Sequence, residues 1–228
     1  LDAERKRPEY VQDVFDTLHW LGLDWDEGPR SPDDFEKNWS QHLRLPLYAQ
    51  LLEALRGGGH VFACGKSRRD LAAFGGDYPL AFRHQNCSLE TPNVAWRIQT
   101  PVPRPADIPP DFVVRRRDGI PAYQVASVAD DLHFGVTHVI RGVDLAGSTA
   151  AQQYLAACAG LTAFSDLSFL HHPLLRDADG GKLSKSAGAA ALKTWREEGR
   201  APSEVFRAVS AWLGVEAVDT AAALVALL

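Results

Sequence analysis

The chain has 228 residues, of which 46% are hydrophobic, and it carries a formal net charge of −5 at pH 7. This length and composition allow one good core with a smaller appended lobe, and no apolar run approaches the roughly 18 residues of a transmembrane helix. The negative net charge gives no bulk attraction to nucleic acid, so any RNA contact has to use local basic runs such as residues 68–69 or 115–117.

Two helices are predicted in the first quarter of the chain. Pro8 can open the first helix, because a proline at the first helical position loses no needed N–H, and Gly22 can cap it. The apolar positions between them follow the helical period of about 3.6 residues. A second amphipathic helix starts near Pro46, and the three glycines at 57–59 end it.

Short strands are predicted at residues 60–64 and 94–98, with an irregular stretch between them that has no long period. A proline-rich linker at 101–110 follows and indicates a boundary. Residues 59–110 are therefore expected to form a small subdomain inserted between two more regular parts of the chain.

Beyond the linker, short apolar runs alternate with helical patterns. Such alternation implies βαβ units and a mostly parallel, doubly wound α/β sheet. The predicted strands cover about 111–116, 136–141 and 167–172, and the predicted helices between them cover about 121–131 and 148–159. Two more amphipathic helices are predicted at about 202–213 and 219–228.

A lysine- and serine-rich loop is the first candidate for chemistry. Residues 182–186 read Lys-Leu-Ser-Lys-Ser and directly follow a turn-forming run at 177–181. Flexible glycines beside paired cations suit a mobile loop that closes on a polyphosphate and neutralises charge as it develops. Lys182 and Lys185 are the candidate cations, although such a run taken alone is commonly a solvated loop.

A second set of candidates surrounds a predicted strand end. Arg141 stands at the carboxyl end of a predicted strand, where ligands of open α/β sheets bind, and its guanidinium can bind a carboxylate with two hydrogen bonds. Tyr123 begins the helix after an Asp-Gly turn, and Ser127 lies one turn further along the same face. Because neighbours on a helix point in different directions, Asp130 and Asp131 are interpreted as a helix end that braces the site.

Together these segments resemble the catalytic core of the class I glutamyl-tRNA synthetases. In that family a strand ending in Arg-Arg-x-Asp-Gly leads to a Tyr-bearing helix, an Asp-Asp pair, a strand ending in Ile-Arg-Gly and a Lys-x-Ser-Lys-x loop. The order and spacing of these motifs agree over residues 8–190. The resemblance implies a Rossmann-type catalytic core in two parts, 1–58 and 111–186, with the insertion at 59–110 and a C-terminal helical segment at 187–228.

The resemblance also implies the chemistry, which is activation of glutamate with ATP and Mg²⁺. By this resemblance Arg141 binds the glutamate γ-carboxylate and Tyr123 contacts the substrate. Ser127 occupies a position where some members carry a polar amide, so it either contacts the substrate or only follows the helix face. Adenylate formation needs no protein base, since the attacking carboxylate is already ionised at neutral pH.

In the loop, Lys185 corresponds to the lysine that binds phosphate in this family, and Lys182 and Ser184 are expected beside the nucleotide. The family's first strand and its His-Ile-Gly-His-type nucleotide signature have no counterpart before Leu1. The chain is therefore expected to be truncated at its N-terminus and inactive as given.

The insertion carries a degenerate zinc region. The short members of the family often bind zinc through a Cys-x-Cys pair, a Tyr and a later Cys, and here Cys64 and Tyr78 match while Lys66 and Phe82 cannot ligate. We therefore expect no bound metal and an insertion packed by aromatic side chains. An alternative ligand set has tolerable residue types but no recognised spacing. Its members are His60, Cys64, His84 and Cys87.

The compact layout resembles that of the short paralogues in this family, the glutamyl-queuosine tRNA(Asp) synthetases, because about 40 residues after the loop leave no room for an anticodon-binding domain. The expected partners are glutamate, ATP and a tRNA, namely the aspartate tRNA that carries queuosine. We also expect a monomer without a membrane partner. Three cysteines without a disulfide pattern favour a reducing cytoplasm.

Two alternatives remain open at this point. The chain could be the catalytic fragment of a full glutamyl-tRNA synthetase, which charges the glutamate tRNA. It could also be a non-catalytic paralogue that serves as an RNA-binding module, which the missing signature and the degenerate zinc region favour. Intact Arg141, Tyr123 and Lys185 speak against that second alternative.

Overall fold

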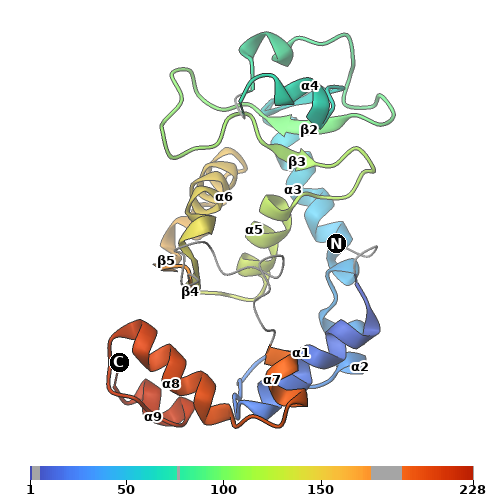
Figure 1. Ribbon diagram of the computed structural model, residues 1–228. Coiled ribbons are helices and arrows are strands. Elements are labelled where there is room, and N and C mark those ends of the chain that lie inside the picture. Colours follow the sequence, from blue (N-terminus) through green and yellow to red (C-terminus); the bar gives the residue numbers. More distant parts are fainter. Residues whose placement is uncertain (2–5, 76–77, 176–191, 228) are drawn as a thin grey trace. The chain divides into compact units, whose positions relative to one another are not determined.

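The computed structural model describes residues 1, 6–75, 78–175 and 192–227, and the chain divides into two compact units. The first unit consists of Leu1 and Gln41–Pro173, and the second consists of Asp2–Ser40 and Leu174–Leu228. Figure 1 shows the helices and strands of both units with their labels.

An antiparallel sheet forms one end of the first unit. It contains β1 (Val61–Cys64), β2 (Ala95–Ile98) and β3 (Val113–Arg115) in that order. Contrary to the sequence-based prediction, β3 does not begin the parallel sheet: it pairs antiparallel with β2, with Trp96 opposite Arg115. The Arg115 guanidinium lies 5.1 Å from the centre of the Trp96 ring. This cation–π contact favours the observed pairing.

A βαβ unit supplies the expected parallel pairing. In it β4 (His138–Gly142) is followed by α6 (Ala146–Cys158) and β5 (Ser168–His172), and the two strands are parallel with Arg141 opposite His171. A right-handed crossover through a helix is the usual way to join two parallel strands.

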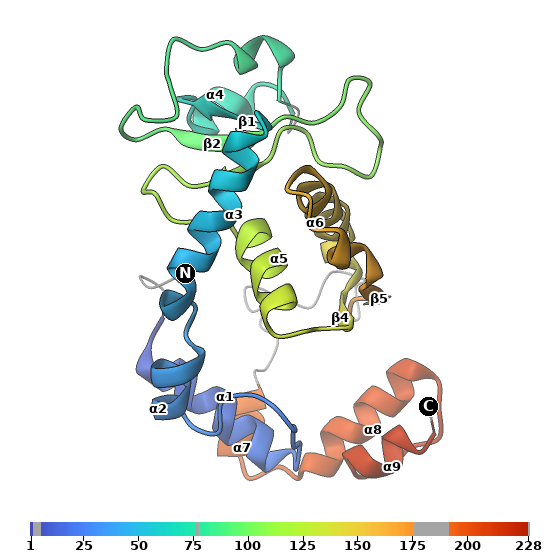
Figure 2. The ribbon, with the colours of Figure 1, turned by 180° about the vertical axis from the view of Figure 1, so that it is seen from behind.

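Two further helices pack beside this βαβ unit. Helix α5 (Tyr123–His133) lies between α6 and α3 (Leu45–Gly57), as both views show (Figures 1 and 2). Pro46 occupies the first turn of α3, and Gly59 adopts a φ of +71° just beyond its end, as the sequence analysis expected. The core between these helices is apolar. Its fully buried members include Leu55, Ile98, Val125, Val128, Leu155 and Phe164.

A partly buried carboxylate ties α5 to the start of α3. Asp130 accepts hydrogen bonds from Arg44 Nε at 2.7 Å, from Gln41 Nε2 at 2.9 Å and from Tyr48 Oη at 2.7 Å. Burial acts to raise the pKa of Asp130, but these hydrogen bonds outweigh it and hold the pKa below its usual value. Asp130 therefore braces the packing of α5 on α3, whereas the bracing of the site by both aspartates stays a prediction.

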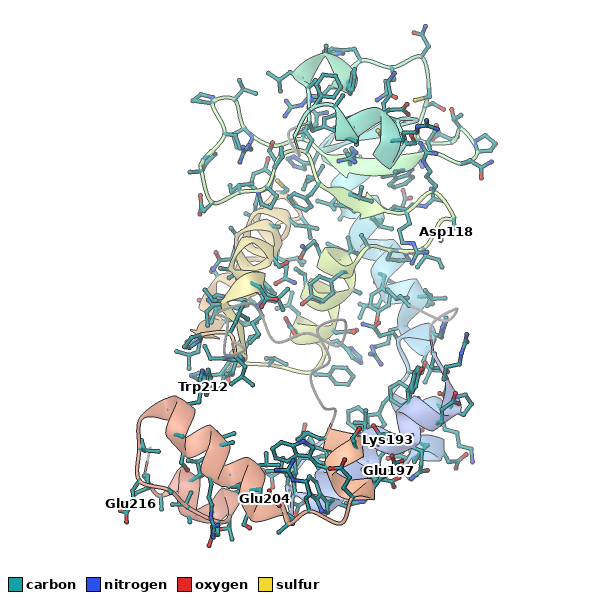
Figure 3. All side chains as sticks on the ribbon, in the orientation of Figure 1. Asp118, Lys193, Glu197, Glu204, Trp212 and Glu216 are labelled. Atoms are coloured by element: carbon teal, nitrogen blue, oxygen red, sulfur yellow. The ribbon has the colours of Figure 1, made fainter. Side chains whose placement is uncertain are left out.

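The second unit is helical. Its elements are α1 (Pro8–Trp20), α2 (Pro32–Asp34), α7 (Leu192–Glu197), α8 (Pro202–Leu213) and α9 (Ala221–Val225). Helix α7 packs on α1, where Arg196 donates to Asp13 and Thr17 at 2.7 Å each. Figure 3 labels Lys193 and Glu197 on α7 and Glu204 on α8.

Short helical segments complete both units. They are η1 (Phe35–Trp39), η2 (Gln41–Arg44), α4 (Arg68–Ala72), η3 (Leu80–Arg83), η4 (Val143–Leu145) and η5 (Thr162–Asp166). Within the described ranges, no helix combines the length and the apolar character needed to cross a bilayer.

Candidate functional site

Arg141 is the centre of the candidate site. It lies near the carboxyl end of β4, and its side chain is half-buried between β5 and the helices α5 and α6. Its Nη2 atom donates to Thr149 Oγ1 at 2.5 Å and to Gln152 Oε1 at 2.8 Å. The guanidinium carbon lies 5.2 Å from the centre of the Phe169 ring, a distance that allows a cation–π contact.

The remaining side of this guanidinium is available to a ligand. Both Nη2 protons are used, whereas among the described residues Nη1 donates one long hydrogen bond, of 3.4 Å, to Tyr123 Oη. The Tyr123 side chain is on the surface, with 52% of its area exposed. A cation and a hydroxyl that adjoin on an open side form a suitable arrangement for a carboxylate.

Three residues of this site, Thr149, Gln152 and His171, are not among the sequence-based candidates. Thr149 and Gln152 are buried on α6, and Thr149 Oγ1 lies 2.8 Å from His171 Nε2. His171, on β5, therefore has a hydrogen-bond partner on α6. The spacing of Thr149 and Gln152, three residues apart on a helix that follows Arg141, could have indicated that both face this strand end.

Ser127 is the other candidate site residue on α5. Ser127 lies one turn after Tyr123 and is half-buried, but among the described residues no hydrogen bond joins it to Arg141. Gln124 Nε2 donates to Ser148 Oγ at 3.2 Å, and this hydrogen bond ties α5 to α6. A substrate contact for Ser127 stays a prediction.

Asp131 contributes negative charge near the site. Its pKa is raised mainly by burial, and the nearby Asp130 adds to this effect while Arg141 opposes it. In the part of the chain that the structure describes, no ion pair joins Asp131 to Arg141. Arg141 and Asp131 therefore attract each other through space without a direct contact between their charged groups among these residues.

The loop residues of the candidate site, Lys182, Ser184 and Lys185, lie outside the described residues. Their predicted roles at the nucleotide therefore remain proposals.

The degenerate zinc region is held together by hydrogen bonds. Tyr78 Oη donates to Cys64 Sγ at 3.1 Å, and Gln85 Nε2 donates to Tyr78 Oη at 3.1 Å. The two residues that replace ligands also meet, since Lys66 Nζ lies 4.9 Å from the centre of the Phe82 ring. Burial acts to raise the pKa of the Cys64 thiol, but the hydrogen bonds outweigh it and lower the pKa.

The alternative zinc ligands are not brought together. His60 and Cys64 lie at the two ends of the extended segment at β1, and four extended residues span about 13 Å, too far for two ligands of one ion. Cys87 Sγ is instead 3.6 Å from Ala63 O. Within the described ranges, no group of three or more His, Cys, Asp or Glu side chains could hold a metal ion.

The basic run at 115–117 is occupied by protein contacts. Arg115 lies over Trp96, Arg116 Nη2 pairs with Asp118 at 2.6 Å, and Arg117 donates to the Gly65 carbonyl. Asp118 is labelled in the turn that follows β3 (Figure 3). This run is therefore partly committed to holding the insertion and the turn together.

Comparison with known proteins agrees with this arrangement. Residues 84–223, more than half of the chain, match the family of class I tRNA synthetases (E and Q), catalytic domain. The fold is also that of a glutamate tRNA ligase from Elizabethkingia meningosepticum, with a TM-score of 0.69, 23% identity, and coverage of 92% of this chain and 52% of that chain. These matches confirm the expected class I, Rossmann-type α/β core.

Similar proteins indicate which family within the class I synthetases this chain belongs to. A glutamyl-Q tRNA(Asp) synthetase from Parasynechococcus marenigrum is 37% identical over 217 residues, which cover 94% of this chain and 69% of the relative. A glutamate–tRNA ligase from Symbiobacterium thermophilum is 32% identical over 238 residues, and this chain spans 48% of its length. Within the class I synthetases, the chain belongs to the glutamyl-Q tRNA(Asp) synthetase family.

Proposed function

We propose that the protein activates glutamate with ATP to form glutamyl-adenylate and then transfers the glutamate to the queuosine base in the anticodon loop of tRNA(Asp). The observation that carries the proposal is the open side of Arg141. A half-buried guanidinium beside the exposed Tyr123 hydroxyl offers two adjacent hydrogen-bond donors, which suit the side-chain carboxylate of glutamate.

The proposed activation step is an in-line attack. An oxygen of the glutamate α-carboxylate attacks the α-phosphorus of ATP, the bond to the β-phosphate bridging oxygen breaks, and pyrophosphate leaves. Because little covalent chemistry falls to the protein, positioning and charge stabilisation supply most of the acceleration. Lys182 and Lys185, with Ser184 beside them, are proposed to contact the phosphates, and Mg²⁺ is proposed to enter with the triphosphate as part of the substrate.

The proposed tRNA acceptor rests on the relatives. The chain is 37% identical to the glutamyl-Q tRNA(Asp) synthetase from Parasynechococcus marenigrum and 32% identical to the glutamate–tRNA ligase from Symbiobacterium thermophilum. A single-stranded loop base can be splayed out and held by stacking and edge hydrogen bonds, so an active site can act on the anticodon loop directly. The second candidate is charging of the glutamate tRNA, which the similarity to the ligase favours.

The activation step can be tested by exchange of pyrophosphate into ATP. The complete gene product should support exchange with glutamate and not with glutamine, in the absence of tRNA. Arg141→Lys should reduce this preference, because a lysine cannot form the paired hydrogen bonds of a guanidinium. The matched control is Arg207→Lys, at a surface arginine of α8 that pairs with Asp219 at 2.6 Å. Exchange that is equal for glutamate and glutamine would contradict the proposed substrate.

A further inference from the structure

Arg141 is held differently from Arg44 and Arg83, two arginines whose side chains are mostly buried. Arg44 and Arg83, whose side chains are 11% and 16% exposed, each pair with an aspartate at 2.6–2.7 Å. Within the described residues, Arg141 is held by neutral groups, the hydroxyl of Thr149 and the amide oxygen of Gln152. A neutral acceptor fixes a guanidinium without neutralising it, so the positive charge remains for a ligand.

We propose that Gln152 and Thr149 are positioning residues that aim Arg141 and thereby set the preference for a carboxylate over an amide. This inference rests on the proposed function, in which Arg141 binds the glutamate side chain. The two residues take both protons of Nη2, so the guanidinium plane is fixed and Nη1 is turned to the open side beside Tyr123.

The burial of Gln152 argues for positioning rather than for ligand contact. Its side chain is fully buried, at 0% exposure, so a ligand cannot reach it. Its Nε2 atom and Arg141 Nε are two of the five buried polar side-chain atoms that lack a partner among the described residues. A buried amide with an unmet donor destabilises a fold, and an apolar side chain of the same size avoids that cost. Its presence is explained if the amide oxygen is needed to hold Arg141 while leaving it charged.

Thr149 extends the same arrangement to β5. Its hydroxyl contacts both Arg141 Nη2 and His171 Nε2, at 2.5 and 2.8 Å. Arg141 and His171 are directly opposite each other on the parallel strands β4 and β5. The guanidinium is thus held by hydrogen bonds to two side chains of α6, and the Thr149 hydroxyl also links it to His171 on β5.

The test compares near-isosteric variants in the complete gene product. Gln152→Met and Thr149→Val remove one acceptor each, and Gln152→Glu replaces the neutral acceptor with a charged one. The matched control is Gln153→Met, at the exposed neighbouring position of α6. Calorimetric titration measures the affinities for glutamate and for glutamine, and thermal unfolding checks that each variant is folded.

We expect Gln152→Met and Thr149→Val to weaken glutamate binding about tenfold, the scale of one hydrogen bond to a charged group, and to leave glutamine binding within about twofold. Gln152→Glu should weaken glutamate binding more than Gln152→Met, because it neutralises Arg141. Gln153→Met should behave as wild type. If the first two variants bind glutamate as tightly as the control, or if Gln152→Glu keeps wild-type affinity, the proposal is wrong.

A second measurement is independent of ligand binding. The guanidinium nitrogens of Arg141, assigned by their loss in Arg141→Lys, should show slow rotation by ¹⁵N nuclear magnetic resonance in the wild type and fast rotation in Gln152→Met. Unchanged rotation would overturn the positioning role even if a variant were poorly stable. A wild-type protein with no preference for glutamate would instead contradict the proposed function, so the two failures are distinguishable.

Discussion

Asp130 and Asp131 are neighbours on α5, yet the pKa values of their carboxyl groups are shifted in opposite directions. Both are partly buried, and burial alone raises the pKa of each. At Asp130 the hydrogen bonds from Arg44, Gln41 and Tyr48 outweigh burial, whereas Asp131 has only a distant attraction to Arg141. The ionised carboxylate of Asp130 therefore stabilises the folded chain, whereas the ionised carboxylate of Asp131 destabilises it.

This difference predicts opposite effects of the same substitution. Asp130→Asn should lower the free energy of unfolding by about 3 kcal/mol, because it removes the carboxylate charge that pairs with the largely buried Arg44 side chain. Asp131→Asn should leave that free energy unchanged or raise it, which makes it the matched control. Urea denaturation at neutral pH measures both. Equal destabilisation by the two substitutions would show that the carboxylates do not differ as described.

The two pKa shifts predict how the folding stability changes with pH. The lowered pKa of Asp130 means that its contribution to stability is present above its unfolded value of about 3.9 and is lost as the pH falls through the folded value. The raised pKa of Asp131 means that its contribution is present below the unfolded value and is lost as the pH rises through the folded one. The stability of Asp131→Asn relative to wild type should therefore increase from pH 3 toward neutrality, as measured by urea denaturation at a series of pH values. A decrease in this relative stability over the same pH range would show that the pKa of Asp131 is not raised.

The insertion should fold without zinc. Lys66 and Phe82 stand at ligand positions and contact each other, and Tyr78 donates to Cys64. Metal analysis of the purified protein should find less than one zinc per chain. The double variant Lys66→Cys with Phe82→Cys restores four ligand types and should bind one zinc, while Lys66→Cys alone should not. A tightly held zinc in the wild type, lost on replacing Cys87 or His84, would establish the other ligand set.

Lys185 is predicted to act in the activation step. Its replacement by alanine should lower the rate of glutamate activation roughly 10²–10³-fold, the scale of one lost transition-state contact, with little change in glutamate affinity. Lys193→Ala is the control, since Lys193 lies on α7 and pairs with Glu197 at 3.7 Å (Figure 3). Pre-steady-state measurement of adenylate formation separates the rate from the affinity. An unchanged rate in Lys185→Ala would remove this lysine from the proposed site.

Local signals predicted most of the elements. A proline at the start and a glycine after the end mark α1, α3 and α8, and these helices begin within one residue of their predicted starts. Helix α4 was missed although Ser67 and Asp70 form a capping box that could have indicated it. The pairing of β3 could not be predicted in this way, because strand partners depend on contacts distant in sequence, here Trp96 with Arg115.

The candidate site was predictable only in part. The rule that ligands bind at the carboxyl ends of parallel strands singled out Arg141, and the structure places the Tyr123 hydroxyl within 3.4 Å of it. The spacing of Thr149 and Gln152 indicates that they share one face of a helix, but it does not by itself give the partner of that face. They become partners of Arg141 only because α6 packs over β4, which is a tertiary relationship. The substrate roles of Arg141, Tyr123 and Ser127 stay predictions.

Transfer of glutamate to a tRNA tests the central claim most directly. The complete gene product is incubated with labelled glutamate, ATP and one of three purified tRNAs: queuosine-containing tRNA(Asp), the same tRNA without queuosine, and tRNA(Glu). The label should enter only the first, and nuclease fragments should place it in the anticodon loop. Labelling of tRNA(Glu) at its 3′ end, or activation that strictly requires that tRNA, would contradict the account in favour of a glutamyl-tRNA synthetase.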